Sequence, residues 1–385
     1  GQHRDRVEQP SGSMGRTKIE SAKVAAAAAL DQIIDGTWFA VVAGTHQAYL
    51  AYPPARAGAG MVQMSPQTRH EAQQAVRGFR SDGGTAMGTW LLLAGRLFDS
   101  IPMLAQRHAI LLTDGENHNE SPDQLSSAIA SVTGKFQCDC RGVGVDWQVA
   151  EVRRIAQALL GTVDIIPQPE QMAEVFAELM RSAMSRGVAD AQLRVWAPQG
   201  AQVMFVRQVS PTVADLTDRR VEVNPLTGGY PTGAWADESR DYHVSVRLSP
   251  KALGQEQLAA RVQLAVGGEV VAQGLVKAKW SDDDGLTTRI NPEVAHYTGQ
   301  TELAEAIQEG LAAKAAGDDA GATTKLGRAV QLAAQTGNKE ATTRLRKVVD
   351  ITDLETGTVR LKRSVDKADE MALDTASTKT TRVRS

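Results

Sequence analysis

Short apolar segments alternate with helical patterns through the first half of this 385-residue chain, and this alternation restricts the fold more than any other feature. Parallel strands need long crossover connections, which are usually helices that cover the sheet. The order therefore predicts an α/β domain with a doubly wound, mostly parallel sheet. The expected strands are residues 37–43, 47–52, 107–113, 136–145 and 163–166, and the expected helices are residues 18–35, 65–79, 89–98, 122–132, 148–160 and 169–184.

The pattern changes after Gly187. Residues 188–280 carry successive alternating apolar and polar segments separated by turn residues, which predicts an antiparallel β-sandwich domain. Residues 281–350 carry three Ala/Leu-rich helical patterns, of which the first two resemble one tetratricopeptide-type hairpin. Residues 351–385 are polar and Thr-rich, which predicts a disordered tail. Residues 1–187 complete this division as the α/β domain.

Composition excludes several classes of protein. The 42 Lys and Arg residues against 45 Asp and Glu residues leave a net charge of −3, which gives no electrostatic reason for nucleic-acid binding. No apolar run approaches the roughly 20 residues that cross a bilayer, so no membrane partner is expected. Two cysteines exclude a disulfide-rich secreted scaffold, and the N-terminus has no signal-peptide pattern. We therefore expect a cytoplasmic protein.

Three separated clusters of oxygen-bearing residues carry the candidate chemistry. Ser11 and Ser13 precede the first helix, Thr85 lies in a Gly-rich loop before another helix, and Asp114 directly follows an apolar strand. In a doubly wound sheet these positions fall at the edge formed by the carboxyl ends of the strands, where ligands bind. Hydroxyl and carboxylate oxygens are hard ligands that suit Mg²⁺. Each cluster alone is also typical of an ordinary turn or helix cap.

In this order, the clusters resemble the von Willebrand factor A domain and its metal-ion-dependent adhesion site. The resemblance implies that Ser11, Ser13, Thr85 and Asp114 bind Mg²⁺ or another divalent cation. It also implies that an Asp or Glu of a protein partner completes the coordination, in a binding module that is not an enzyme. The order of the domains resembles that of bacterial, especially actinobacterial, multidomain proteins.

One position departs from the family pattern. Gln9 stands where the family has its first Asp, and it offers a neutral oxygen in place of a charge. Residues 1–10 contain a single aliphatic residue, Val7, so the first strand is missing or altered. Two alternatives stay open: an assembly scaffold whose metal site has decayed, and a metal-dependent phosphoryl hydrolase. The hydrolase lacks an evident base, since Asp114 is needed as a ligand.

Other residues allow further hypotheses. Thr375 and Thr378, in the expected flexible tail, resemble phosphothreonine motifs that a Ser/Thr kinase modifies and a forkhead-associated domain reads. The chain would then be a scaffold in bacterial phospho-signalling. Cys138 and Cys140 point to one face of a strand, as small core residues or as a redox pair. His118 lies in the loop after Asp114 and is a candidate neighbour of the ion.

Overall fold

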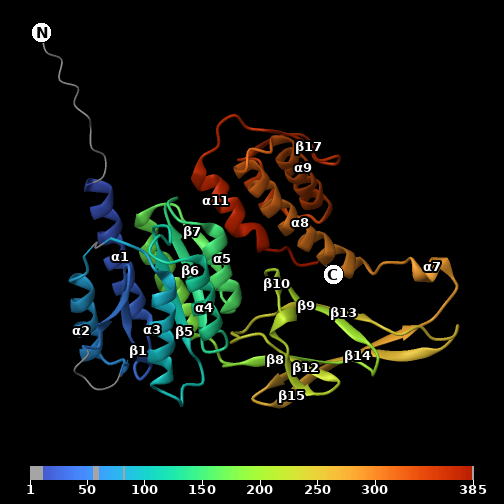
Figure 1. Cartoon of the computed structure of the whole chain (residues 1–385), viewed down its shortest axis with the longest axis horizontal. Helices are drawn as coiled ribbons and strands as arrows, with labels where there is room; N and C mark the ends of the chain where they lie inside the picture. Colours follow the sequence, from blue (N-terminus) through green and yellow to red (C-terminus); the bar gives the residue numbers. More distant parts are fainter. Residues whose placement is uncertain (1–11, 55–59, 81–82, 384–385) are drawn as a thin grey trace, which may run out of the picture. The chain divides into compact units, whose positions relative to one another are not determined.

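The structure is a computed structural model that describes residues 12–54, 60–80 and 83–383. The chain divides into two compact units, Gly1–Arg186 and Gly187–Ser385 (Figure 1). Across the described ranges, none of the helices combines the length and the hydrophobicity that a membrane crossing requires.

A parallel sheet with helices around it forms the first unit, as the alternating pattern predicts. The central strand β6 (Gln137–Val143) pairs in parallel with β5 (His108–Thr113) and with β7 (Val163–Ile166). The other described strands of the unit form two antiparallel pairs, β2 (Val41–Gly44) with β3 (Ala48–Tyr52) and β1 (Trp38–Phe39) with β4 (Val62–Gln63). The helices are α1 (Gly12–Gln32), α2 (Pro66–Arg77), α3 (Met87–Asp99), α4 (Pro122–Val132), α5 (Val149–Ala158) and α6 (Met172–Met184).

Capping residues fix where the helices begin. Ser65 and Ser121 each accept a hydrogen bond from the third residue of α2 and α4, and Pro66 and Pro122 occupy the first helical positions. Helix α1 differs from the prediction, because it begins at Gly12 and not at residue 18. The Gly-containing segment joins the helix since each residue added to a formed helix gains a backbone hydrogen bond. Ser13 therefore lies on the first turn of α1.

The described strands of the first unit do not form one continuous sheet. Strand β2 pairs only with β3, and β5 pairs only with β6, among the described residues. A cavity with a volume of about 400 Å³ separates the facing edges of β2 and β5, and α1, α3 and α6 contribute to its walls. Val42, Ile110 and Leu112 are consequently only partly buried. The expectation of a missing or altered first strand concerns residues 1–10, which lie outside the described residues.

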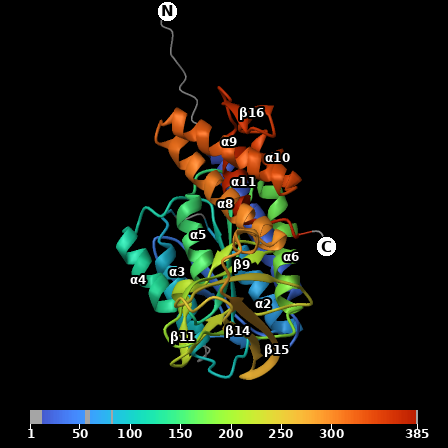
Figure 2. The ribbon, with the colours of Figure 1, turned by 90° about the vertical axis from the view of Figure 1, so that its right-hand side faces the viewer.

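Antiparallel strands begin the second unit, as the alternating pattern predicts. They form a three-stranded sheet in the order β10-β9-β13 and a five-stranded sheet in the order β11-β12-β8-β14-β15. Figure 2 shows β11 and β15 at opposite margins of the larger sheet. The strands are β8 (Ala191–Trp196), β9 (Gln202–Ser210), β10 (Ala214–Asp215), β11 (Val221–Asn224), β12 (Thr227–Pro231), β13 (Asp241–Arg247), β14 (Glu256–Val266) and β15 (Glu269–Lys279).

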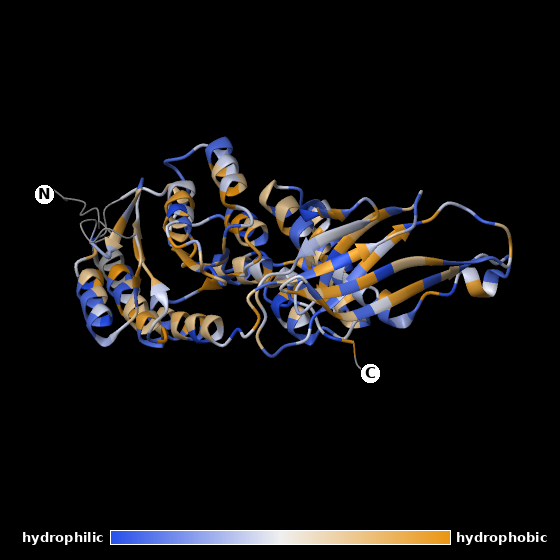
Figure 3. Cartoon of the chain, turned by 90° about the horizontal axis from the view of Figure 1, so that it is seen from below, coloured by the Kyte–Doolittle hydropathy of each residue, from blue (hydrophilic) through white to orange (hydrophobic). Residues whose placement is uncertain are grey.

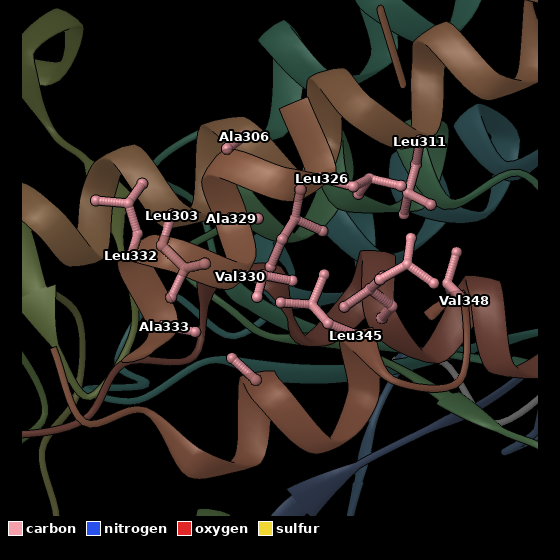
Figure 4. Close-up of a cluster of buried hydrophobic side chains, with 14 residues drawn as sticks. Leu303, Ala306, Leu311, Leu326, Ala329, Val330, Leu332, Ala333, Leu345 and Val348 are labelled. Atoms are coloured by element: carbon pink, nitrogen blue, oxygen red, sulfur yellow. The ribbon is translucent and has the colours of Figure 1, made fainter. Parts of the chain in front are cut away.

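A helical hairpin follows, as the Ala/Leu-rich patterns predict. Its core is a cluster of buried aliphatic side chains from both helices and from the segment after them (Figure 4). The helices approach closely at Gly310, where a methyl group would lie 2.8 Å from Leu326 Cγ. The hairpin consists of α8 (Pro292–Ala315) and α9 (Asp319–Gln335). The short helix α7 (Asp284–Thr287) precedes it, and α10 (Lys339–Leu345) follows it.

The prediction of a disordered tail at residues 351–385 is wrong for most of that segment. The chain forms a hairpin of β16 (Val349–Asp353) and β17 (Thr358–Leu361), then α11 (Lys367–Thr375) and the short η4 (Ala376–Thr378). Leu361, Val365 and Leu373 pack on the α8–α9 core. The segment orders because its few apolar residues recur at the spacing of a strand and of a helix, which average composition does not register.

Candidate metal centre

Two loops bring Thr85 beside the segment that holds Asp114. The backbone N–H of Thr85 donates to Asn119 Oδ1 at 2.9 Å, and the Asn119 N–H donates to the Thr85 carbonyl at 3.1 Å. A methyl group added to Gly115 would lie 3.6 Å from Thr85 Oγ1. The Thr85 hydroxyl therefore lies next to the Asp114-Gly115 turn, at the carboxyl end of β5.

Side chains of the Asp114 loop also hold the start of α3. Ala86, the residue before α3, provides no side-chain cap. Instead, Asn117 Oδ1 accepts from Met87 N–H at 2.8 Å, and Glu120 Oε2 accepts from Gly88 N–H at 2.9 Å. Asn117 Nδ2 donates to the same Glu120 oxygen at 2.7 Å. These bonds satisfy helix donors that would otherwise lack partners, and they fix the loop that ends at Thr85.

Sequence reasoning missed the supporting residues Asn117, Asn119 and Glu120. The available signal was a helix start at Ala86 without a capping side chain, together with three polar residues in the loop after Asp114. Nothing in the local sequence connects the two loops, which lie about 30 positions apart, because the connection depends on β5 and α3 packing in the same unit.

Gly84 is required by the same packing. It adopts a φ of +99°, and a methyl group there would lie 2.8 Å from both Asn119 Oδ1 and His46 Cβ. The Thr45 carbonyl, in the β2–β3 turn, accepts from Ala86 N–H at 3.1 Å and from Trp90 Nε1 at 3.0 Å. Three segments distant in the sequence thus enclose Thr85, and only glycine permits their close approach.

Thr85 and Asp114 leave oxygen atoms available to a ligand. Thr85 is half-buried and Asp114 is exposed, and the side chain of neither makes a hydrogen bond to a described residue. A group of three or more His, Cys, Asp or Glu side chains able to hold a metal is absent from the described ranges. A cation at this edge would therefore need hydroxyl ligands in addition to Asp114, which is the donor chemistry that Mg²⁺ accepts.

Only one of the two candidate serines, Ser13, lies in the part of the chain that the structure describes. Ser11 is outside the described residues, and Ser13 is placed by the helical backbone of α1 alone. The following turn of α1 lies near the loop after β6, since Lys18 Nζ is 3.7 Å from Asp146 Oδ2. The start of α1 and the carboxyl end of β6 therefore share one edge of the unit.

Acidic side chains surround this edge. Burial, and then the negative charges of Glu116 and Glu120, raise the pKa of Glu151. His118 is exposed, and its Nε2 lies 3.2 Å from Glu116 Oε2. Asp146 pairs with Lys18, while Gln148 occupies the cap position of α5. The accumulated negative charge favours a bound cation over an anion.

A second cluster lies at the opposite end of β5 and β6. Asp139 is buried, and its Oδ2 lies 2.7 Å from His108 Nε2. Its Oδ1 accepts from the Thr162 N–H and hydroxyl, each at 2.8 Å. Burial would raise the pKa of Asp139, but the hydrogen bond and charge of His108 and the bonds from Thr162 lower it overall. These contacts make Asp139 an ionised structural residue.

Cys138 and Cys140 flank this aspartate within the core. Both are fully buried as free thiols, with their Sγ atoms 3.9 Å apart. The contact with Cys140 and burial raise the pKa of Cys138. A protonated thiol without solvent access is unreactive, so these residues act as small core side chains.

The comparisons with known proteins agree with this architecture. Residues 15–165 match the von Willebrand factor type A domain, and residues 331–377 match the von Willebrand factor type A C-terminal domain. The second match includes β16, β17 and α11, most of which lie in residues 351–385, where the composition predicts disorder.

Three relatives define the extent of the similarity. The structure of a von Willebrand factor type A protein from Catenulispora acidiphila is 50% identical, with a TM-score of 0.90 over 97% of this chain and 88% of that one. The ArnB paralogue VWA2 from Sulfolobus acidocaldarius shares the fold at 15% identity, with a TM-score of 0.55 over 96% of this chain and 86% of that one.

An uncharacterised protein from Synechocystis sp. is 28% identical over 213 residues, which are 54% of this chain and 48% of that protein. The chain thus spans about half the length of this curated relative. The close match to the Catenulispora structure covers almost all of both proteins. On this evidence the chain belongs to the von Willebrand factor type A family.

Proposed function

We propose that this chain is a non-catalytic protein-interaction module that binds a carboxylate of a partner through a divalent cation, Mg²⁺ in the first instance. Thr85 and Asp114, with Ser11 and Ser13 from the segment at the start of α1, would hold the cation. When bound, the cation supplies an open coordination position for an Asp or Glu oxygen of the partner.

The reciprocal bonds between Thr85 and Asn119 are the observation that carries the proposal. They hold the Thr85 hydroxyl beside the turn that carries Asp114, so this oxygen is held in place by contacts within the chain. Preorganised ligands lose little conformational entropy on binding, and this increases affinity. Asn117 and Glu120 support the arrangement from the start of α3.

A decayed metal site in an assembly scaffold is the second candidate, and Gln9 is the observation that favours it. The affinity of oxygen-ligand sites depends on how many charged ligands they contain. With Asp114 as its one assigned carboxylate, the proposed site would be weak, and partner capture would then not depend on metal. Phosphoryl hydrolysis is not favoured, because Asp114 serves as a ligand and no base is assigned beside it.

Cellular setting and regulation are also parts of this proposal. The free thiols of Cys138 and Cys140 suit a reducing compartment, which supports a cytoplasmic module. A role in phospho-signalling, with a kinase and a forkhead-associated partner, would need modification outside Thr375, since that residue is 1% exposed. Thr378 is half-buried and remains the candidate of the original pair.

Titration with Mn²⁺, a spectroscopic substitute for Mg²⁺, tests the metal site without a known partner. Calorimetry and electron paramagnetic resonance should show one site on the full chain that Mg²⁺ displaces. Asp114→Ala should weaken binding at least about tenfold, and Gln9→Asp should strengthen it about tenfold by adding a charged ligand.

Asp123→Ala is the matched control, since Asp123 is an exposed residue at the start of α4. It should leave Mn²⁺ affinity unchanged. Binding that is insensitive to both Asp114→Ala and Gln9→Asp would overturn the proposed ligand set. Absence of binding in every variant, including Gln9→Asp, would favour the scaffold with a decayed site.

A further inference from the structure

Strand β15 has an open, apolar edge in the second unit. It pairs with β14 on one side and, among the described strands, with none on the other. Val270, Val271, Leu275 and Val276 are 42–58% exposed. Figure 3 shows hydrophobic positions in orange along the long strands of this unit. Proteins usually protect such edges with proline, charge or a covering segment, because an open edge recruits another strand.

The sequence of this edge is self-complementary about Gln273. In an antiparallel pairing of two copies centred there and counted residue by residue, Ala272 would face Gly274, and Val271, where the β14–β15 register shifts, would face Leu275. Val270 would then face Val276, and Glu269 would face Lys277. Each cross-strand pair is small with small, apolar with apolar, or acidic with basic, and such pairs stabilise a sheet.

We propose that β15 is the interface of a symmetric homodimer, in which two copies of the chain join their five-stranded sheets across a two-fold axis at Gln273. The expected partner is a second copy of the chain, because a two-fold axis pairs β15 with an identical strand. That pairing places Glu269 of each copy opposite Lys277 of the other. An unrelated strand would need no such symmetry. The interface is isologous, so it closes at two copies.

Pairing at this edge has a clear physical benefit. The unpaired backbone N–H and C=O groups of β15 would gain partners, and the four exposed aliphatic side chains would lose part of their contact with water. The Gln273 side chain already accepts a hydrogen bond from Gln263 Nε2 on β14 at 2.9 Å, which holds it at the proposed axis. A dimer would also carry two copies of the proposed metal site, so a partner with two carboxylate sites would bind with increased avidity.

Analytical ultracentrifugation of the full chain over a range of concentrations tests the interface. The wild type should shift toward twice the monomer mass as concentration rises. Glu269→Lys or Lys277→Glu alone should raise the dissociation constant about tenfold, because each places two like-charged pairs across the axis. The double variant Glu269→Lys/Lys277→Glu should restore dimerisation, since it reverses every pair.

Lys251→Glu, an exposed change of the same charge outside β15, is the matched control and should leave the dissociation constant unchanged. All positions are on the surface, so circular dichroism should show the same fold throughout. A wild type that stays monomeric at all concentrations would overturn the inference. So would a dimer that the single charge reversals do not weaken, or one that the double variant does not restore.

Discussion

The two units use β-structure differently, and the difference locates where each is vulnerable. In the second unit, the long strands β14 and β15 pair along almost their whole length, and the α8–α9 hairpin has a continuous aliphatic core. Among the described strands of the first unit, β2 and β5 do not pair with each other, and both are only partly buried beside the cavity. The first unit therefore depends more on helix packing and on the buried contacts of Asp139.

The facing edges of β2 and β5 lie close to the candidate metal centre. Strand β5 leads into Asp114, and the turn after β2 holds the Thr85 loop through the Thr45 carbonyl. Weakness at the β2 and β5 edges would therefore affect the placement of the proposed ligands.

Replacing the buried Asp139 carboxylate should produce the largest difference in stability between the two units. Asp139→Asn leaves His108 without its ionised partner and should destabilise the first unit by about 3–5 kcal/mol. Urea unfolding followed by hydrogen exchange should show the loss in β5, β6 and β7 and none in β14 or β15. The control Asp123→Asn, at an exposed position, should change stability by less than about 0.5 kcal/mol. Equal losses in both units would contradict the assigned role.

Lowering the pH should remove the stability that Asp139 contributes to the first unit. The pKa of Asp139 is lower in the folded chain than its usual value, so the folded state binds fewer protons than the unfolded state. Its contribution is fully present above about pH 5 and declines as pH falls below about 4. The stability gap between wild type and Asp139→Asn should shrink over that range in pH-dependent urea unfolding. A gap that stays constant down to pH 2 would exclude this linkage.

Hydrogen exchange on the unmodified chain should distinguish the units directly. Backbone amides of β2 and β5 on the edges facing the cavity lack strand partners among the described residues, whereas β14 has strands on both sides. We expect at least about tenfold faster exchange at the cavity-facing amides of β2 and β5 than in the centre of β14. Comparable protection would mean that the cavity edges are covered in solution.

The smallest expected effect is on the rate at which a kinase phosphorylates Thr375. It is 1% exposed in α11, and its hydroxyl donates to the Ala372 carbonyl at 3.3 Å. A Ser/Thr kinase can reach it only through local unfolding, so modification of the native chain should be at least about tenfold slower than that of a free peptide of residues 366–383. Mass spectrometry measures both rates. Equal rates would show that α11 opens readily.

The sequence predicted the fold class because the spacing of apolar residues and the order of strands and helices can be read directly along the chain. It also predicted the positions of Thr85 and Asp114 at one edge, which follow from strand order. It did not predict the order of residues 351–383, because Leu361, Val365 and Leu373 acquire their role only by packing on α8 and α9. For the same reason it missed Asn117, Asn119 and Glu120, whose partners belong to a separate loop.

The most direct test of the central claim is the crystal structure of the chain with Mn²⁺, with the metal located by anomalous scattering. The proposal predicts one strong peak within coordination distance of Thr85 Oγ1 and an Asp114 carboxylate oxygen, with the same peak stronger in Gln9→Asp. A peak bound elsewhere, or an empty Thr85–Asp114 edge in Gln9→Asp at saturating Mn²⁺, would contradict it.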